Sequence, residues 1–202
     1  MANICSNFVV LSGVKRQINA AFKELKAMVK LQEKNGPQLP SFSKLDDGHF
    51  QELYVNKPEA DMLDFQCLTN WAPNIEALEE FCKHFQLCAI VSYQELGSDV
   101  YGRAYISLDA ETVSIELKEL PKYYKRKGYH KLHGFVIEDD HFYEYLDELL
   151  EQEIVLHRFP GCRRIVKNKK YFANKLRDWA ETFRDEPDDE DGNENKTFEN
   201  IR

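Results

Sequence analysis

The residues best suited to chemistry are basic side chains interleaved with tyrosines in the second half of the chain. Cations neutralise phosphate groups, and tyrosine rings stack on unpaired bases. The pattern therefore predicts a nucleic-acid contact formed by Lys122, Tyr123, Tyr124, Lys125, Arg126, Lys127, Arg163, Arg164 and Lys167. The alternative is a solvated segment whose charges pair with the acidic residues between 144 and 153.

A set of histidines follows the first basic run and could bind a metal ion. His130 and His133 stand in an H-x-x-H spacing, and His141 follows Asp139 and Asp140. Imidazoles and carboxylates bind zinc and other transition metals. Because H-x-x-H occurs often by chance and H-E-x-x-H is absent, we expect no metal and no other cofactor.

An enzyme based on a cysteine or serine nucleophile is the alternative function class. Cys5, Ser6, Cys82 and Cys88 are the candidates, and His84 lies close to Cys82 in the sequence. Positions 82 and 84 of a helix point to different sides, however, and Cys82 lies on an apolar stripe. The chain contains no nucleophile elbow, phosphate-binding loop or dinucleotide-binding glycine motif. These observations favour a protein without catalytic activity.

The composition is that of a globular chain with an uneven charge. The chain has 202 residues, 43% of them hydrophobic, and a net charge of −8. Residues 1–117 carry 10 basic and 16 acidic side chains, residues 118–184 carry 15 and 11, and residues 185–202 carry 2 and 8. The acidic balance argues against a nonspecific DNA coat, whereas the basic middle segment leaves nucleic acid open as a partner.

The location of the chain is indicated by what its sequence lacks. No apolar run approaches the length of a membrane span, and the N-terminus lacks a signal-peptide pattern. The five cysteines are odd in number and form no C-x-x-C pair. We therefore expect a cytoplasmic protein with reduced thiols that does not enter a membrane.

Hydrophobic periodicity predicts strands and helices in the first half. Alternation predicts strands at 5–11, 62–69, 87–95 and 100–108, with one more around 113–117. Spacing of 3.6 residues predicts a helix from Val14 to about Lys34, for which Ser12 is a plausible N-cap, and another that Asn74 caps. Residues 36–60 look like a long loop with one short extended piece at 53–55. Two amphipathic helices over an antiparallel sheet predict a two-layer α+β sandwich in residues 1–117.

The second half is expected to extend this domain. Apolar spacing predicts one helix that opens at Asp139 or Asp140 and another between Tyr171 and Phe183. We therefore predict a helical, basic extension over residues 118–184 that packs on the first domain. Residues 185–202 are acidic and poor in apolar side chains, which predicts a disordered tail.

Three short motifs resemble a known family. They are Asn3-Ile4-Cys5-Ser6-Asn7 before an apolar strand, Trp71-Ala72-Pro73-Asn74 before a helix, and Tyr93-Gln94-Glu95-Leu96-Gly97 followed by Gly102. Over roughly residues 1–108 the chain resembles the YubB-like, or Api-type, ferredoxin-like family of bacterial plasmids, phages and other mobile elements. The chain departs from the family in carrying Ile4 where a Trp is frequent and in having no Trp between 36 and 61.

The resemblance implies a ferredoxin-like fold and a bacterial mobile element as the source. It brings no catalytic residue. Its motif residues could form a surface at one end of the sheet, or they could be structural; they are Asn3, Asn7, Trp71, Tyr93 and Glu95. We therefore expect a non-enzymatic binding module whose partner is a nucleic acid or another protein, with a metal- or cysteine-dependent enzyme as the alternative.

Overall fold

The computed structural model describes residues 3–118, 120, 125–126, 129–132, 135–158, 174–175 and 177–178. The chain divides into two compact units, Met1–Pro121 with Glu144–Lys167 and Lys122–Tyr143 with Asn168–Arg202. Each unit is described on its own below. The predicted acidic tail lies outside the described residues.

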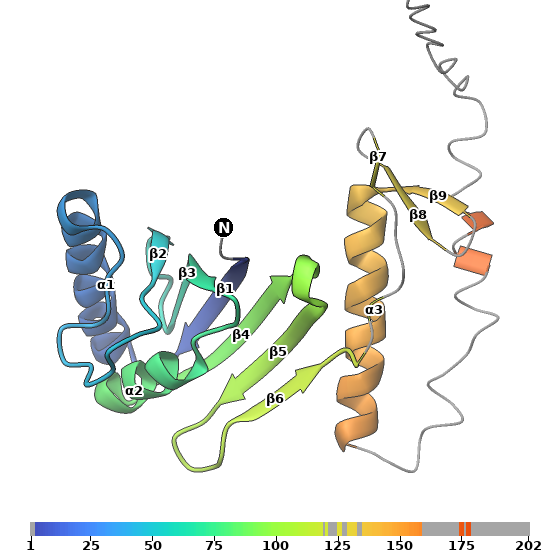
Figure 1. The fold of residues 1–202 in the computed structure, drawn as a ribbon. Coiled ribbons are helices and arrows are strands. Elements are labelled where there is room, and N and C mark those ends of the chain that lie inside the picture. The colour runs from blue at the N-terminus through green and yellow to red at the C-terminus, as the bar shows by residue number, and fades with distance from the viewer. Residues whose placement is uncertain are drawn as a thin grey trace, which may run out of the picture. The chain divides into compact units, whose positions relative to one another are not determined.

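The first unit is built on a six-stranded antiparallel sheet (Figure 1). Its strands are β1 (Ile4–Ser12), β2 (Gln51–Val55), β3 (Met62–Asn70), β4 (Cys88–Glu95), β5 (Val100–Ile106) and β6 (Val113–Glu116). They lie side by side in the order β2-β3-β1-β4-β5-β6. The first four strands and two helices follow the ferredoxin-like β-α-β-β-α-β path, and β5 and β6 widen the sheet at the β4 edge.

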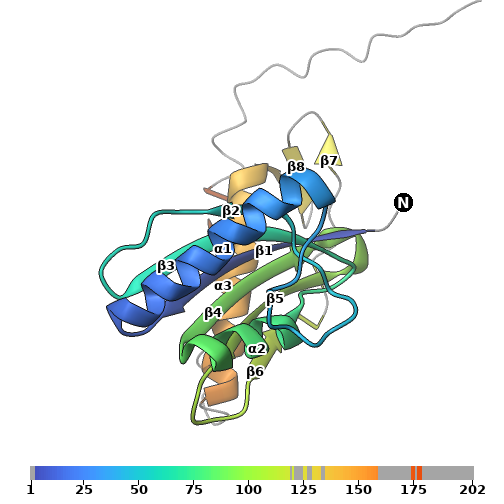
Figure 2. The same cartoon turned by 90° about the vertical axis from the view of Figure 1, so that its left-hand side faces the viewer.

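Two helices cover one face of this sheet, as the sequence predicted (Figure 2). They are α1 (Lys15–Asn35) and α2 (Ile75–Phe85). Asn74 caps α2 because its Oδ1 accepts a 3.2 Å hydrogen bond from the Ala77 N–H. Ser12 does not cap α1, because it is the last residue of β1; the N-cap is Val14, whose N–H donates to Gln17 Oε1 instead.

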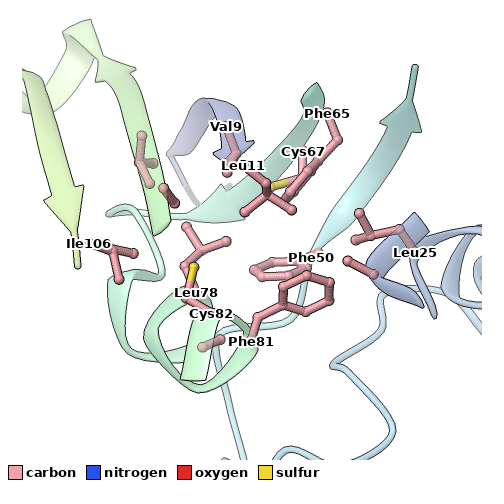
Figure 3. Close-up of a cluster of buried hydrophobic side chains, with 14 of the residues drawn as sticks. Val9, Leu11, Leu25, Phe50, Phe65, Cys67, Leu78, Phe81, Cys82 and Ile106 are labelled. Atoms are coloured by element: carbon pink, nitrogen blue, oxygen red, sulfur yellow. The ribbon is translucent and has the colours of Figure 1, made fainter. Parts of the chain in front are cut away.

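The hydrophobic core fills the space between the sheet and these helices (Figure 3). Strand side chains alternate strictly, so Val9, Leu11 and Phe65 point into the core. Helix α2 supplies Phe81, which is completely buried, and the connection after α1 supplies Phe50. The core therefore draws on β1, β3, α1, α2 and the connection between α1 and β2.

The connection after α1 is more ordered than the predicted loop. Its residues 51–55 form β2, which pairs with β3 as an edge strand. The pairing shifts register between Gln51 and Tyr54, and Glu52 has a φ of 46°. Such a bulge obscures the alternation on which a sequence-based strand prediction depends.

The second face of the sheet is covered only in part. Helix α3 (Asp139–Arg158) begins at one of the two predicted residues, and its portion from Glu144 onward belongs to the first unit. That portion is held to β5 by the Tyr101 hydroxyl, which donates a 2.8 Å hydrogen bond to Asp147 Oδ1. The Arg158 guanidinium lies 5.6 Å from the centre of the Tyr105 ring.

The second unit contains three short strands that the sequence analysis did not predict. They are β7 (Lys125–Arg126), β8 (Tyr129–Leu132) and β9 (Phe135–Glu138), paired in that order. The helix predicted to open at Asp139 or Asp140 is present as α3, whereas these three strands occupy positions for which neither a helix nor a strand was predicted. The β-branched pair Val136-Ile137 favours a strand, but the strands are too short for a clear period-2 signal. The predicted helix between 171 and 183 is described only at four helical residues, 174–175 and 177–178.

Candidate binding face

The part of the second sheet face not covered by α3 carries large apolar side chains in contact with solvent. We call this surface the open face. Alternation turns these residues away from the core: Ile4, Ser6, Phe8 and Val10 of β1, Tyr54 of β2, Met62, Gln66 and Leu68 of β3, and Ile90, Ser92 and Gln94 of β4. Phe8 is 41% exposed and Ile90 is 44% exposed. Clustered apolar exposure of this kind marks a binding site more often than scattered exposure does.

The strand register places the open-face side chains in rows across the sheet. One row runs from Tyr54 through Gln66, Phe8 and Ser92 to Arg103, each residue paired with the next on the adjacent strand. Neighbouring strands lie about 4.8 Å apart, so the two aromatic rings sit about 10 Å apart with an amide between them. The row presents apolar and polar groups to the same partner.

A groove of about 300 Å³ runs along the open face where α3 begins to cover the sheet. Its lining combines apolar and polar side chains, among them Ser6, Phe8, Gln94, Arg103, Asp147 and Leu150. All of these residues belong to the first unit. The groove therefore has an apolar floor on β1 and a polar wall on β5 and α3.

The polar wall is organised around Arg103. Its guanidinium contacts Glu151 Oε1 at 2.5 Å, and its Nε donates to Ser92 Oγ at 3.3 Å. Burial, the largest single effect, lowers the pKa of Arg103, but the hydrogen bonds and charge interactions with Glu151 and Tyr105 together outweigh it, and the net shift is upward. Asp147 accepts from the neutral Tyr101 hydroxyl, so this contact leaves its charge uncompensated at the rim.

The electrostatic balance of this region is negative. Glu144, Asp147 and Glu151 recur on one side of α3 and are exposed. Asp64 adds a fourth carboxylate on the face itself, where the Asn56 amide donates to it. Arg103 pairs with Glu151 of this set. A partner with basic side chains is complementary to this rim.

The five family-motif residues lie near one end of the sheet, but only part of the set reaches solvent. Trp71 is 56% exposed, and its backbone N–H donates to the carbonyl of the half-buried Asn3 at 2.9 Å. Asn7, Tyr93 and Glu95 are buried. The prediction that all five form a binding surface is not tested by this arrangement and stays a prediction.

The buried members of that set hold strands together. The Asn7 amide donates to the carbonyls of Cys5 and Cys67 and, at 2.9 Å, to the Thr69 hydroxyl. The Tyr93 hydroxyl donates to Glu116 Oε1 at 2.9 Å. Burial, followed by that hydrogen bond, raises the pKa of Tyr93 above its usual range. Glu95 Oε1 accepts from the Gly97 N–H at 3.0 Å.

Of the cysteines named as candidate nucleophiles, Cys5 and Cys82 lie in the core, whereas Cys88 is half-buried at the start of β4. Burial raises the pKa of Cys5 to about 11 and that of Cys82 to about 12, so both thiols are protonated at neutral pH. A nucleophilic cysteine needs the opposite shift. His84 does not reach toward Cys82; it stacks on Phe42 with 3.7 Å between ring centres.

The metal and nucleic-acid candidates fall largely outside the described residues. Of the three histidines, His141 is half-buried near the start of α3, His130 contributes backbone to β8, and His133 is not described. No group of three metal-binding side chains occurs in the described part of the chain. Lys125 and Arg126 form β7. The other residues of the predicted nucleic-acid contact lie outside the described residues: Lys122, Tyr123, Tyr124, Lys127, Arg163, Arg164 and Lys167.

Sequence reasoning did not single out the open face. The sequence feature that indicates this face is the alternation in β1: Phe8 and Val10 are apolar, yet they point away from the core residues and from the two predicted helices. Arg103 and Asp147 gave no local signal, because their proximity depends on α3 folding back onto β5 across more than forty residues.

Comparison with known protein families agrees with the ferredoxin-like arrangement of the strands and helices. A family model described as the ferredoxin-like domain in Api92-like protein matches residues 50–135. The chain is similar to this Api-type domain. The match runs from Phe50, just before β2, to Phe135, the first residue of β9, and supports the ferredoxin-like fold and the Api-type part of the resemblance. Nothing matched in the comparisons with curated proteins and with solved structures. None of the helices in the described ranges is long and apolar enough to span a membrane.

Proposed function

We propose that the chain is a non-catalytic interaction module that binds a polypeptide segment on its open face. The observation that carries this proposal is the exposure of Phe8, Ile90 and Tyr54 on one sheet face beside a groove. A ferredoxin-like sheet with one closed face and one half-open face offers a flat platform for a partner.

The chemistry of the partner follows from the groove. Phe8 and Leu150 favour apolar side chains, and Asp147 and Glu151 at the rim favour Lys or Arg. Phe8 supplies the aromatic anchor on which affinity at such interfaces commonly depends. The expected ligand is therefore a short apolar segment that carries basic residues.

The groove chemistry favours binding over catalysis. Neither a histidine nor a cysteine stands among the described residues that line it. Several of its polar side chains are instead engaged in fixed contacts: Arg103 is bonded to Ser92 and Glu151, and Tyr101 to Asp147. General acid–base catalysis usually needs a titrating group within reach of the substrate, most often a histidine.

A selection from a random-peptide phage library tests this function. We expect peptides enriched in apolar and basic residues that lose binding to Phe8→Glu and to Asp147→Lys. Leu31→Glu is the matched control, because Leu31 is 46% exposed on α1, away from the groove. Peptides that bind Phe8→Glu as well as wild type, or a selection without enrichment, would contradict the proposal.

We also propose, from the motif resemblance, that the module belongs to a bacterial mobile element. The supporting residues are Asn3–Asn7, Trp71–Asn74 and Tyr93–Gly97. The genes that flank the coding sequence test this part: replication, conjugation or phage genes are expected, and a chromosomal operon of metabolic genes would count against it.

A further inference from the structure

We propose that the outer face of α1 binds the phosphate backbone of a nucleic-acid duplex. The helix carries six cations, Lys15, Arg16, Lys23, Lys26, Lys30 and Lys34, and only two acids, Glu24 and Glu33. This surface lies on the opposite side of the sheet from the open face and is made of different residues.

The six cations share one side of the helix. Arg16, Lys23 and Lys30 follow one another at intervals of seven residues. Because seven residues make almost two full turns, each of these side chains points within about 20° of the one before it. Lys26 and Lys34 stand three and four residues after Lys23 and Lys30, so they lie beside this line. All six are exposed, while Ile18, Ala21, Leu25 and Met28 on the opposite side are buried. We call the six residues the basic stripe.

The stripe is not neutralised by neighbouring acids. Among the described residues no ion pair involves a residue of the stripe; Lys83–Glu79 and Arg103–Glu151 lie elsewhere. Glu24 is turned toward the following loop, where it accepts a 2.8 Å hydrogen bond from the Ser41 N–H. Glu33 stands three residues after Lys30, but no acid stands at i,i+4 spacing from a cation of the stripe, as acids do on an ordinary solvated helix.

The charge separation within the first domain is pronounced. Outside α1, residues 1–117 carry 4 basic and 14 acidic side chains, against 6 and 2 on the helix itself. The stripe thus concentrates the cations of an acidic domain on one surface about 29 Å long, the rise of the helix from Lys15 to Lys34 at about 1.5 Å per residue. A polyanion of similar length is its complement.

The surface chemistry favours a duplex over single strands and over a membrane. The stripe contains no aromatic ring for stacking on unpaired bases, so its contacts would be to phosphates and independent of sequence. Membrane-surface helices insert an apolar face between lipids, but the apolar face of α1 is already packed in the core. Duplex DNA presents one phosphate per about 1.7 Å of axis, which a linear stripe can follow.

The test measures the binding of the full chain to a 24-base-pair DNA duplex by fluorescence anisotropy at several salt concentrations. The logarithm of the association constant falls linearly with the logarithm of the salt concentration, and the slope becomes shallower by about 0.9 for each phosphate that the protein no longer neutralises. We expect the double variant Lys23→Gln, Lys30→Gln to reduce the slope by about 1.8 and to weaken binding. Gln forms helices about as well as Lys, so the fold should persist; a thermal melt checks this.

Lys44→Gln, Lys57→Gln is the matched control. Both lysines are exposed outside α1, and the double variant changes the net charge by the same amount. Equal weakening in both double variants would show a general charge effect and overturn the proposal. Unchanged binding in the α1 double variant, with weaker binding on replacing Lys125, Arg126 and Lys127 by Gln, would assign the contact to the basic segment instead. Binding to phosphatidylserine vesicles but not to the duplex would also overturn it.

Discussion

The ring and hydroxyl of Tyr93 lie 2.7 Å from the place that a Cβ on Gly102 would occupy. The two residues are directly paired on β4 and β5, and the Tyr93 hydroxyl crosses this position to reach Glu116 on β6. A glycine on β5 therefore allows one tyrosine to link three strands.

Gly102→Ala should lower the free energy of unfolding by about 1–3 kcal/mol, the usual cost of forcing a methyl group into a packed site. Urea denaturation measures the change. In the background of Tyr93→Ala the same substitution should cost clearly less, because Glu116 Cγ is then the one remaining atom of the three within 2.7 Å of the methyl group. Equal costs in the two backgrounds would show that Tyr93 does not exclude the methyl group.

Asn7→Ala should destabilise the fold by about 1–3 kcal/mol, because the carbonyls of Cys5 and Cys67 lose a buried donor. Asn19→Ala on the exposed side of α1 is the control and should change stability by less than about 0.5 kcal/mol. Both are measured by urea denaturation. Similar values for the two variants would contradict a structural role for the Asn7 amide.

Stability should fall as the pH rises above about 9. Burial raises the pKa of Cys5 to about 11 and those of Cys67 and Cys82 to about 12, whereas thiols of the unfolded chain titrate near 9. Between these values the unfolded chain has released protons that the folded state still holds, so alkali favours unfolding. The thiol contribution is complete below pH 9 and is lost as the pH approaches 11 to 12.

Urea denaturation at about pH 8 and about pH 10.5 measures this dependence. Replacing Cys82 by Ala should reduce the loss of stability between the two pH values, although the variant starts from a lower stability. A loss of the same size in wild type and Cys82→Ala would show that other groups, such as lysines, cause it.

The two faces of the sheet should respond differently to the loss of an aromatic ring. Phe65 is completely buried, so Phe65→Ala should cost about 3–5 kcal/mol. Phe8 lies on the neighbouring strand and faces the other way. Phe8→Ala should lower the free energy of unfolding by less than about 1 kcal/mol, because much of the ring is already in water. Thermal or urea unfolding gives both values. A large loss for Phe8→Ala would mean that its ring stabilises the fold.

The fold of the first domain could be predicted because local signals agree with the final packing. Val9, Leu11 and Phe65 alternate, Ile18 and Leu25 recur at helical spacing, and Asn74 caps α2 as expected. The sequence predicts only the extended piece at 53–55 of strand β2, because the bulge at Glu52 breaks the alternation before it. The groove could not be predicted either, since Arg103 meets Glu151 only through tertiary folding, which leaves no pattern in the sequence.

The central claim is that a partner segment binds across the open face of β1, β3 and β4 against the rim of α3. Amide chemical-shift mapping with a peptide obtained from the selection tests it most directly. The account predicts shifts that concentrate at Ser6, Phe8, Ser92, Gln94 and Asp147 and leave the α1 and α2 amides unchanged. Shifts centred on α1 and α2 instead, with the amides around Phe8 unmoved, would contradict it.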